Sequence, residues 1–178
     1  MKFIILLLGI LVAACTLGHG QNHQTMKTRY YEKPIVEMTL NGKKTWVLLD
    51  TGSDITVFNL KSKDRYDFHA HQDFNQQIKV AGFGSRHNQL HQVTNARLYF
   101  GEMQLKSDFY AYDITNIVSS IRARTGKHVT AILGTNLMRQ YGFVIDMGTN
   151  TVSIEYKVKK NKRSQKQDSE LTIAKNTK

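Results

Sequence analysis

Short stretches of alternating apolar and polar residues fill the chain from Tyr30 to Tyr156, and they predict strands more often than helices. Two of these stretches, PIVEMTL and KTWVLLD, flank Asn41-Gly42, a dipeptide typical of a two-residue hairpin turn. Further strand candidates are DITVFNL, QIKVAG, QLHQVTNARLYFG, MQLKSDFYAYDI, HVTAILG and FVIDMGTNTVSIEY. The pattern therefore predicts a mostly β domain, closed like a barrel or packed as a sandwich.

One short helix is predicted near the C-terminal end of this domain. In TNLMRQYG, the side chains of Leu137, Met138 and Tyr141 share a helical face, and Gly142 suits the end of a helix. The single proline, Pro34, stands at the start of a strand, where its missing N–H does least harm. We therefore expect one folded domain over residues 29–156 with a single short helix.

The first residues form an apolar run of another kind. Lys2 precedes FIILLLGILVAA, which is too short to span a bilayer and has the length of a signal-peptide core. The following LVAAC resembles a bacterial lipoprotein signal, in which the cysteine is lipidated and becomes the new N-terminus. We expect a signal peptide over residues 1–14, a lipidated Cys15, a tether over residues 15–28 and an exported protein anchored to a membrane of the cell envelope. A secreted or periplasmic protein with an ordinary signal peptide is the alternative.

The charge of the chain is +11, and much of it lies at the C-terminus. Residues 157–178 hold eight lysines and arginines against two acidic residues and almost no apolar side chains. This composition predicts a basic, disordered tail. We expect no nucleic-acid partner, because no aromatic residues are interleaved with the basic ones for stacking on bases. Cys15 is the only cysteine, so an internal disulfide is excluded.

The candidate chemistry lies in WVLLDTGSDITVF, where an apolar strand ends on Asp50. Gly52 allows a tight turn that brings backbone N–H groups to the carboxylate, and Thr51 and Ser53 add hydroxyls. A carboxylate held on a stiff, hydrogen-bonded turn suits general acid–base catalysis. On this tripeptide alone, a plain turn at the end of a strand is the alternative.

WVLLDTGSDITVF resembles the active-site loop of aspartic peptidases, and the later AILGTNLMRQYGFVIDMGTNTVSI resembles the second signature of their retropepsin-like, retroviral-type members. The resemblance covers residues 30–156 and implies a closed, β-barrel-like acid-protease fold with a single lobe per chain. It also implies that three residues support the active-site loop, namely Ile132, Leu133 and Gly134. In the same way VAGFGSRHNQ resembles a flap, whose tip would be Gly82, Phe83 and Gly84.

The same resemblance implies an aspartic endopeptidase, in which two carboxylates share a proton and activate a water. This chain has one such loop, so the second carboxylate is expected from Asp50 of an identical chain in a homodimer. Asp146 follows the predicted helix and precedes Met147, so we expect it to be a turn carboxylate instead. Asp54 is expected to point away from the site. The substrate would be a peptide or protein segment in extended conformation.

Ser53 stands where retroviral members usually have alanine. A hydroxyl that donates to the neighbouring carboxylate favours its ionised form. We therefore expect Ser53 to give the enzyme a more acidic pH optimum than an alanine at this position.

A non-catalytic module on the same fold, binding a peptide or an envelope ligand, is the alternative function. The pairs His69/His71 and His87/His91 raise the possibility of a metal site, but an i,i+4 pair needs a helix and a third ligand, and this stretch is expected to be flap and strand. We therefore expect neither a metal nor another cofactor.

Overall fold

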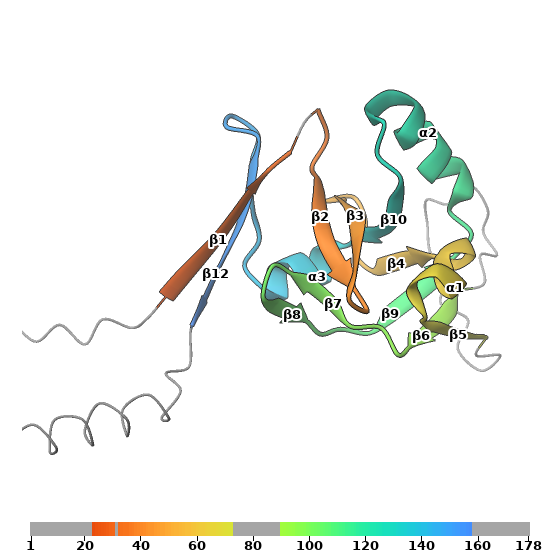
Figure 1. Ribbon diagram of the computed structural model, residues 1–178. Coiled ribbons are helices and arrows are strands. Elements are labelled where there is room, and N and C mark those ends of the chain that lie inside the picture. The colour runs from red at the N-terminus through yellow and green to blue at the C-terminus, as the bar shows by residue number, and fades with distance from the viewer. Residues whose placement is uncertain (1–22, 31, 73–89, 158–178) are drawn as a thin grey trace, which may run out of the picture. The chain divides into compact units, whose positions relative to one another are not determined.

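The computed structural model describes residues 23–30, 32–72 and 90–157 (Figure 1). Several predicted features lie outside these residues: the signal peptide, Cys15, the flap residues Gly82, Phe83 and Gly84, and the tail beyond Lys157. Within the described residues, no helix is long and apolar enough to cross a membrane.

Most described strands join one sheet, in the order β5-β6-β9-β4-β10-β3-β2-β7-β8. In chain order they are β2 (Ile35–Leu40), β3 (Lys43–Leu49), β4 (Thr56–Asn59), β5 (His69–Gln72), β6 (His91–Thr94), β7 (Leu98–Phe100), β8 (Met103–Leu105), β9 (Phe109–Tyr112) and β10 (Val129–Leu133). Strand β10 runs parallel to β3 and antiparallel to β4. The predicted mostly β fold is confirmed. Asn41 and Gly42 have φ angles of 48° and 80°, as the predicted two-residue turn between β2 and β3 requires.

A second sheet has the order β1-β12-β11, formed by β1 (His23–Arg29), β11 (Val144–Asp146) and β12 (Thr151–Lys157) (Figure 1). All of strand β1 except Arg29 lies within the segment that the sequence predicted as a tether, and the folded domain begins at about residue 23 instead of 29. Besides its pairing with β12, side-chain contacts hold this strand: the Tyr156 hydroxyl donates to Gln24 Oε1 at 3.0 Å, and Met26 packs against the main core. Both the hydroxyl of Tyr156 and the core residues around Met26 come from distant parts of the chain, so the sequence near β1 does not predict these contacts.

The helices differ in part from the prediction. The expected one is present as α3 (Thr135–Gln140), with Leu137 and Met138 buried. A 3₁₀ turn (Leu60–Ser62), the short α1 (Lys63–Tyr66) and the longer α2 (Thr115–Thr125) were not predicted, so the expectation of a single helix was wrong. Helix α2 ends at Thr125 and is capped by Gly126, whose φ of 70° is a left-handed conformation that glycine adopts at low cost.

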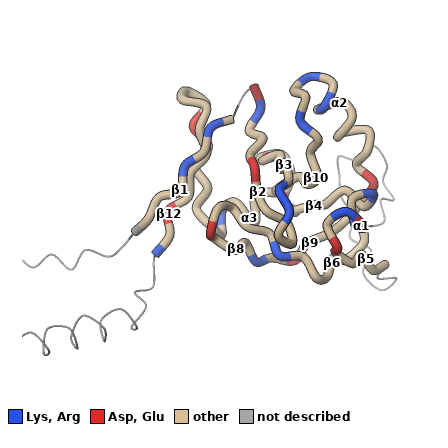
Figure 2. The backbone as a smooth tube through the Cα atoms, viewed as in Figure 1, with Lys and Arg blue, Asp and Glu red and all other residues tan. Residues whose placement is uncertain are grey.

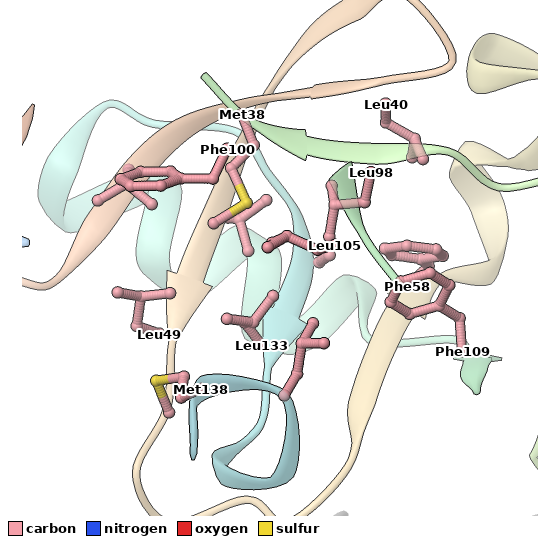
Figure 3. Close-up of a cluster of buried hydrophobic side chains, with 14 of the residues drawn as sticks. Met38, Leu40, Leu49, Phe58, Leu98, Phe100, Leu105, Phe109, Leu133 and Met138 are labelled. Atoms are coloured by element: carbon pink, nitrogen blue, oxygen red, sulfur yellow. The ribbon is translucent and has the colours of Figure 1, made fainter. Parts of the chain in front are cut away.

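The main core lies on one face of the large sheet and includes α3 (Figure 3). Phe58 and Phe109 pack with ring centroids 5.1 Å apart and ring planes tilted by 33°. Leu49 and Leu133, the last residues of β3 and β10, are 2% and 0% exposed. These two buried side chains anchor the strand ends from which the candidate site is built.

Candidate active site

Asp50 comes directly after β3 and is held there by backbone hydrogen bonds on both sides. Leu49 N–H donates to the carbonyl of Pro34 at 2.9 Å, next to the start of β2. Asp50 N–H donates to the carbonyl of Leu133 at 3.0 Å, at the end of β10. The position of Asp50 is therefore defined by both neighbouring strands of the large sheet.

The turn after Asp50 points its backbone toward the carboxylate. Gly52 N–H donates to Asp50 Oδ1 at 2.9 Å, and Ser53 N–H donates to the carbonyl of Asp50 at 3.2 Å. Asp50 is half-buried in the single chain, while Thr51 and Gly52 are exposed. The predicted hydrogen-bonded turn is present, but the carboxylate is less buried than its place after an apolar strand suggested.

The hydroxyl of Ser53 has a different partner from the one expected. It donates to the carbonyl of Ile55 at 2.9 Å and so holds the outgoing part of the loop. The expected acid shift of the pH optimum assumed a bond from this hydroxyl to Asp50. That expectation has no basis in this geometry, and Ser53 acts on the shape of the loop.

The junction between β10 and α3 is hydrogen-bonded to the same loop. Thr135 N–H donates to the carbonyl of Ser53 at 2.7 Å, and Asn136 N–H donates to the carbonyl of Asp54 at 3.1 Å. Gly134 lies so close to the loop that a Cβ built on it would be 2.4 Å from the carbonyl oxygen of Ile55. Only glycine fits between the junction and the loop without a shift of backbone.

The three residues predicted to support the loop therefore lie beside it, each in a different way. Gly134 touches the loop backbone, and the carbonyl of Leu133 accepts the N–H of Asp50. Ile132 packs with Val57 in a second apolar cluster on the other face of the sheet. Their contribution to catalysis stays a prediction.

The two other aspartates near the signatures have local hydrogen-bond partners. Asp54 Oδ1 accepts the hydroxyl of Thr135 at 3.2 Å. Asp146 accepts the N–H groups of Gly148 and Thr149 at 2.9 and 3.0 Å, and Thr149 Oγ1 donates to its second oxygen at 2.7 Å. The Thr149 hydroxyl, helped by these N–H groups, holds the pKa of Asp146 below its ordinary value. Asp146 is a turn carboxylate, as expected.

The histidines do not assemble a metal site in the part of the chain that the structure describes, where no group of three metal-ligating side chains occurs. His69 and His71 are exposed on β5 with ring centroids 6.2 Å apart. His71 Nε2 lies 3.1 Å from the hydroxyl of Thr94. His87 lies outside the described residues.

Helix α2 is the part of the site region that sequence reasoning missed. It packs against the face of β3, β4 and β10 that lies opposite the main core. Its start is held by Asp113, whose Oδ1 accepts Thr115 N–H at 3.1 Å and the Thr115 hydroxyl at 2.5 Å. Bonds from the Thr115 hydroxyl and N–H lower the pKa of Asp113. Apolar residues at helical spacing, Ile114, Val118 and Ile121, were the signal that could have found this helix.

A family model described as aspartyl protease matches residues 36–137, which is more than half of the chain. The fold is similar to the crystal structure of a retropepsin-like aspartic protease from Rickettsia conorii, with 12% identity and a TM-score of 0.50, covering 77% of this chain and 94% of that one. A search of curated proteins gave no match.

Two further solved structures show weaker likeness. The retroviral protease-like domain of Ddi1 from Leishmania major has 14% identity and a TM-score of 0.47, covering 75% of this chain and 99% of that one. EIAV protease complexed with the inhibitor HBY-793 has 19% identity and a TM-score of 0.43, covering 62% of this chain and 92% of that one. The family match includes the loop that carries Asp50 and the junction at Gly134. The chain therefore belongs to the aspartyl protease family, and its domain has the single-lobed, retropepsin-like fold.

Proposed function

We propose that the protein is an aspartic endopeptidase that works as a homodimer, with Asp50 of each protomer as its acid–base group. The observation that carries this proposal is the setting of Asp50. Its loop is hydrogen-bonded to the last residue of β10 and to the first residues of α3, yet the carboxylate remains partly exposed. A rigidly placed, accessible carboxylate is what general acid–base catalysis needs.

Two chains are needed because the reaction uses two carboxylates that share one proton. Asp54 and Asp146 of the same chain are engaged in local hydrogen bonds, which favours Asp50 of a second chain as the partner. One Asp50 accepts a proton from water as the water oxygen adds to the scissile carbonyl carbon. The other gives its proton to the carbonyl oxygen. Collapse of the resulting diol breaks the C–N bond, and the leaving amine takes up a proton, so no covalent enzyme intermediate forms.

The edge of the second sheet offers a surface for this dimer. Strand β11 has one neighbour, β12, and its other side is unpaired within the described part of the sheet. Val144 and Met147, which lie at this strand and its turn, are 59% and 65% exposed although both are apolar. We infer that two β11 edges pair antiparallel across a two-fold axis, which would cover these side chains. Thr51, exposed in the single chain, would then help to lock the two loops together.

Two parts of the proposal rest on the sequence alone. Gly82, Phe83 and Gly84 would close over an extended peptide as a flap. Cys15 would carry the lipid that anchors the exported protein to a membrane of the cell envelope. Mass spectrometry of the mature N-terminus tests the second point, because lipidation predicts a diacylated cysteine that a Cys15→Ser variant lacks. An unmodified N-terminus at another residue would contradict it.

The catalytic role is tested by Asp50→Asn, with Asp54→Asn as the matched control. We expect Asp50→Asn to abolish cleavage of a peptide library at every pH while urea unfolding and sedimentation stay unchanged. Asp54→Asn should remain active, because an asparagine oxygen can still accept the Thr135 hydroxyl. Residual cleavage by purified Asp50→Asn would refute the assignment. A folded, dimeric wild type without activity at any pH would favour the binding module instead.

A further inference from the structure

Strand β3 presents two rows of side chains, and Asp50 continues the row that faces away from the main core. Thr45, Val47 and Leu49 are buried, whereas Trp46 and Leu48 are half-buried. Asp50 N–H still pairs with β10, so the strand geometry continues as far as Asp50. Side chains alternate between the two faces of a strand, so Asp50 follows Leu48 on the same face. Trp46, Leu48 and Asp50 therefore lie in one row on the second face of the sheet.

Helix α2 forms a wall on that face, beside β10 (Figure 1). Its side chains Ile117 and Val118 pack in a cluster that includes Leu48, and Ile121 packs with Ile35. The helix therefore borders the row of residues that leads to Asp50.

A hollow of about 350 Å³ lies between α2 and Lys33. It is lined by Lys33, Asn116, Ile117, Ser120, Ile121 and Arg124. The carbonyl of Pro34 accepts Leu49 N–H at 2.9 Å, so Lys33 stands close to the end of β3. One residue of its lining, Lys33, is therefore next in the chain to the backbone partner of Leu49, the residue before Asp50.

A second hollow of about 160 Å³ shares Arg124 with the first. Its walls include Arg29, Tyr30, Glu32, Trp46 and Lys127. The ammonium of Lys127 lies over the ring of Trp46, 3.9 Å from the centroid. The two hollows meet at Arg124, and together we call them the α2 groove.

The charge of the α2 groove is mostly positive. Four cations line it against the single carboxylate of Glu32; they are Arg29, Lys33, Arg124 and Lys127. The ion pairs found among the described residues, Lys44–Glu37 and Lys61–Asp113, involve none of these four side chains. Figure 2 shows basic segments at the start of β2 and around the end of α2. The groove is therefore complementary to an anionic segment.

We propose that the α2 groove binds an acidic stretch of the peptide substrate, an inference that rests on the proposed peptidase function. Lys33 and Arg124 pair with Asp or Glu carboxylates, while Ile117 and Ile121 contact the aliphatic parts of the same segment. An exposed guanidinium (Arg124) and a half-buried ammonium (Lys33) beside apolar side chains favour this combination over a neutral peptide.

The proposal is tested by measuring how tightly peptides bind to the full chain carrying Asp50→Asn, which should not cleave them. The probes are an extended peptide that contains several Glu and Leu residues and the same peptide with each Glu replaced by Gln. We expect the acidic peptide to bind about tenfold more tightly at low salt, as two partly exposed ion pairs allow. The preference should shrink as ionic strength rises. Trp46 is the only tryptophan in the chain, so its fluorescence should change on binding.

Arg124→Glu and Arg122→Glu form a matched pair of variants. Both positions are exposed in the last turn of α2, but only Arg124 lines the groove. We expect Arg124→Glu to weaken binding of the acidic peptide about fivefold or more and Arg122→Glu to change it little. Both variants keep the basic tail, so equal losses of affinity for the acidic peptide in the two variants would refute binding in the groove. Equal binding of the acidic and neutral peptides would refute it too, and so would an unchanged Trp46 fluorescence.

The outcomes separate this inference from the proposed function. If wild type cleaves both peptides alike and Asp50→Asn cleaves neither, the peptidase stands and the acidic preference is refuted. If the acidic peptide binds through Arg124 but wild type cleaves no peptide at any pH, the groove stands as an acidic-peptide site and the peptidase is refuted.

Discussion

Replacing Gly134 with alanine tests how the active-site loop is held. The new Cβ would lie 2.4 Å from the carbonyl oxygen of Ile55, 2.6 Å from its carbonyl carbon and 2.7 Å from the carbonyl carbon of Asp54. These are backbone atoms, which cannot rotate away as a flexible side chain can. The loop or the β10–α3 junction must therefore move by roughly 1 Å to restore ordinary contact.

The cost has two parts. An extra methyl group in a tightly packed place destabilises by about 1–3 kcal/mol. A movement of this size also strains the two bonds that join the junction to the loop, from Thr135 N–H to Ser53 and from Asn136 N–H to Asp54. Each such bond is worth about 1 kcal/mol. We therefore expect Gly134→Ala to lower the free energy of unfolding by about 3–5 kcal/mol in total.

Urea unfolding of the purified full chain measures this loss, with Gly148→Ala as the control. A Cβ at Gly148 would meet a side-chain oxygen of Asp146 at 3.3 Å, which can give way, so its cost should stay below about 1 kcal/mol. Peptidase activity should fall with Gly134→Ala even under conditions where the variant is folded, because the Asp50 loop is displaced. A loss of less than about 1 kcal/mol for Gly134→Ala, or one equal to that of Gly148→Ala, would refute the argument from close contact.

Three further measurements concern other parts of the molecule. Val144→Asp places a charge on the β11 edge and should raise the dimer dissociation constant at least about tenfold in sedimentation; unchanged association would exclude this edge from the interface. Thr149→Val removes the main cause of the lowered pKa of Asp146, so NMR should show that pKa rising toward 3.8, and identical titration curves would contradict the cause. A carboxyl whose pKa is lowered in the folded state stabilises the fold at pH values above its unfolded pKa of 3.8. The wild type should therefore be more stable than Thr149→Val at neutral pH, and this ionisation part of the difference should disappear as the pH falls below 3.8. Asp113→Ala removes the acceptor for Thr115 at the start of α2 and should cost about 1 kcal/mol at pH 7 by urea unfolding. An unchanged midpoint would show that these hydrogen bonds to Asp113 do not stabilise the fold.

Several features followed from the sequence because they depend on neighbours along the chain. Asn41-Gly42 predicts its turn through the positive φ angles that asparagine and glycine tolerate. Leu137 and Met138 predict α3 through their spacing, and both are buried as expected. The place of Asp50 at the end of an apolar strand likewise follows from the residues before it.

Strand β1 could be recognised only in the tertiary structure, and helix α2 has only a weak signal in the sequence, the helical spacing of Ile114, Val118 and Ile121. The apolar residues of α2 are scattered among polar ones, and their common face is defined by the sheet that they cover. Strand β1 is polar, and its side-chain partner Tyr156 stands 132 positions from Gln24. Pairing between segments so far apart has no local signature, because strand propensity depends on the surface that a strand meets.

The amino-acid sequence by itself determined that a carboxylate stands on a turn after a buried strand and that a glycine-containing signature follows later in the chain. Tertiary structure decided what these residues touch. Ser53 donates to Ile55 instead of Asp50, and Gly134 lies against the loop backbone. A sequence specifies which groups can donate, accept or fit, but the direction of a hydroxyl and the closeness of two backbones depend on how distant strands are brought together.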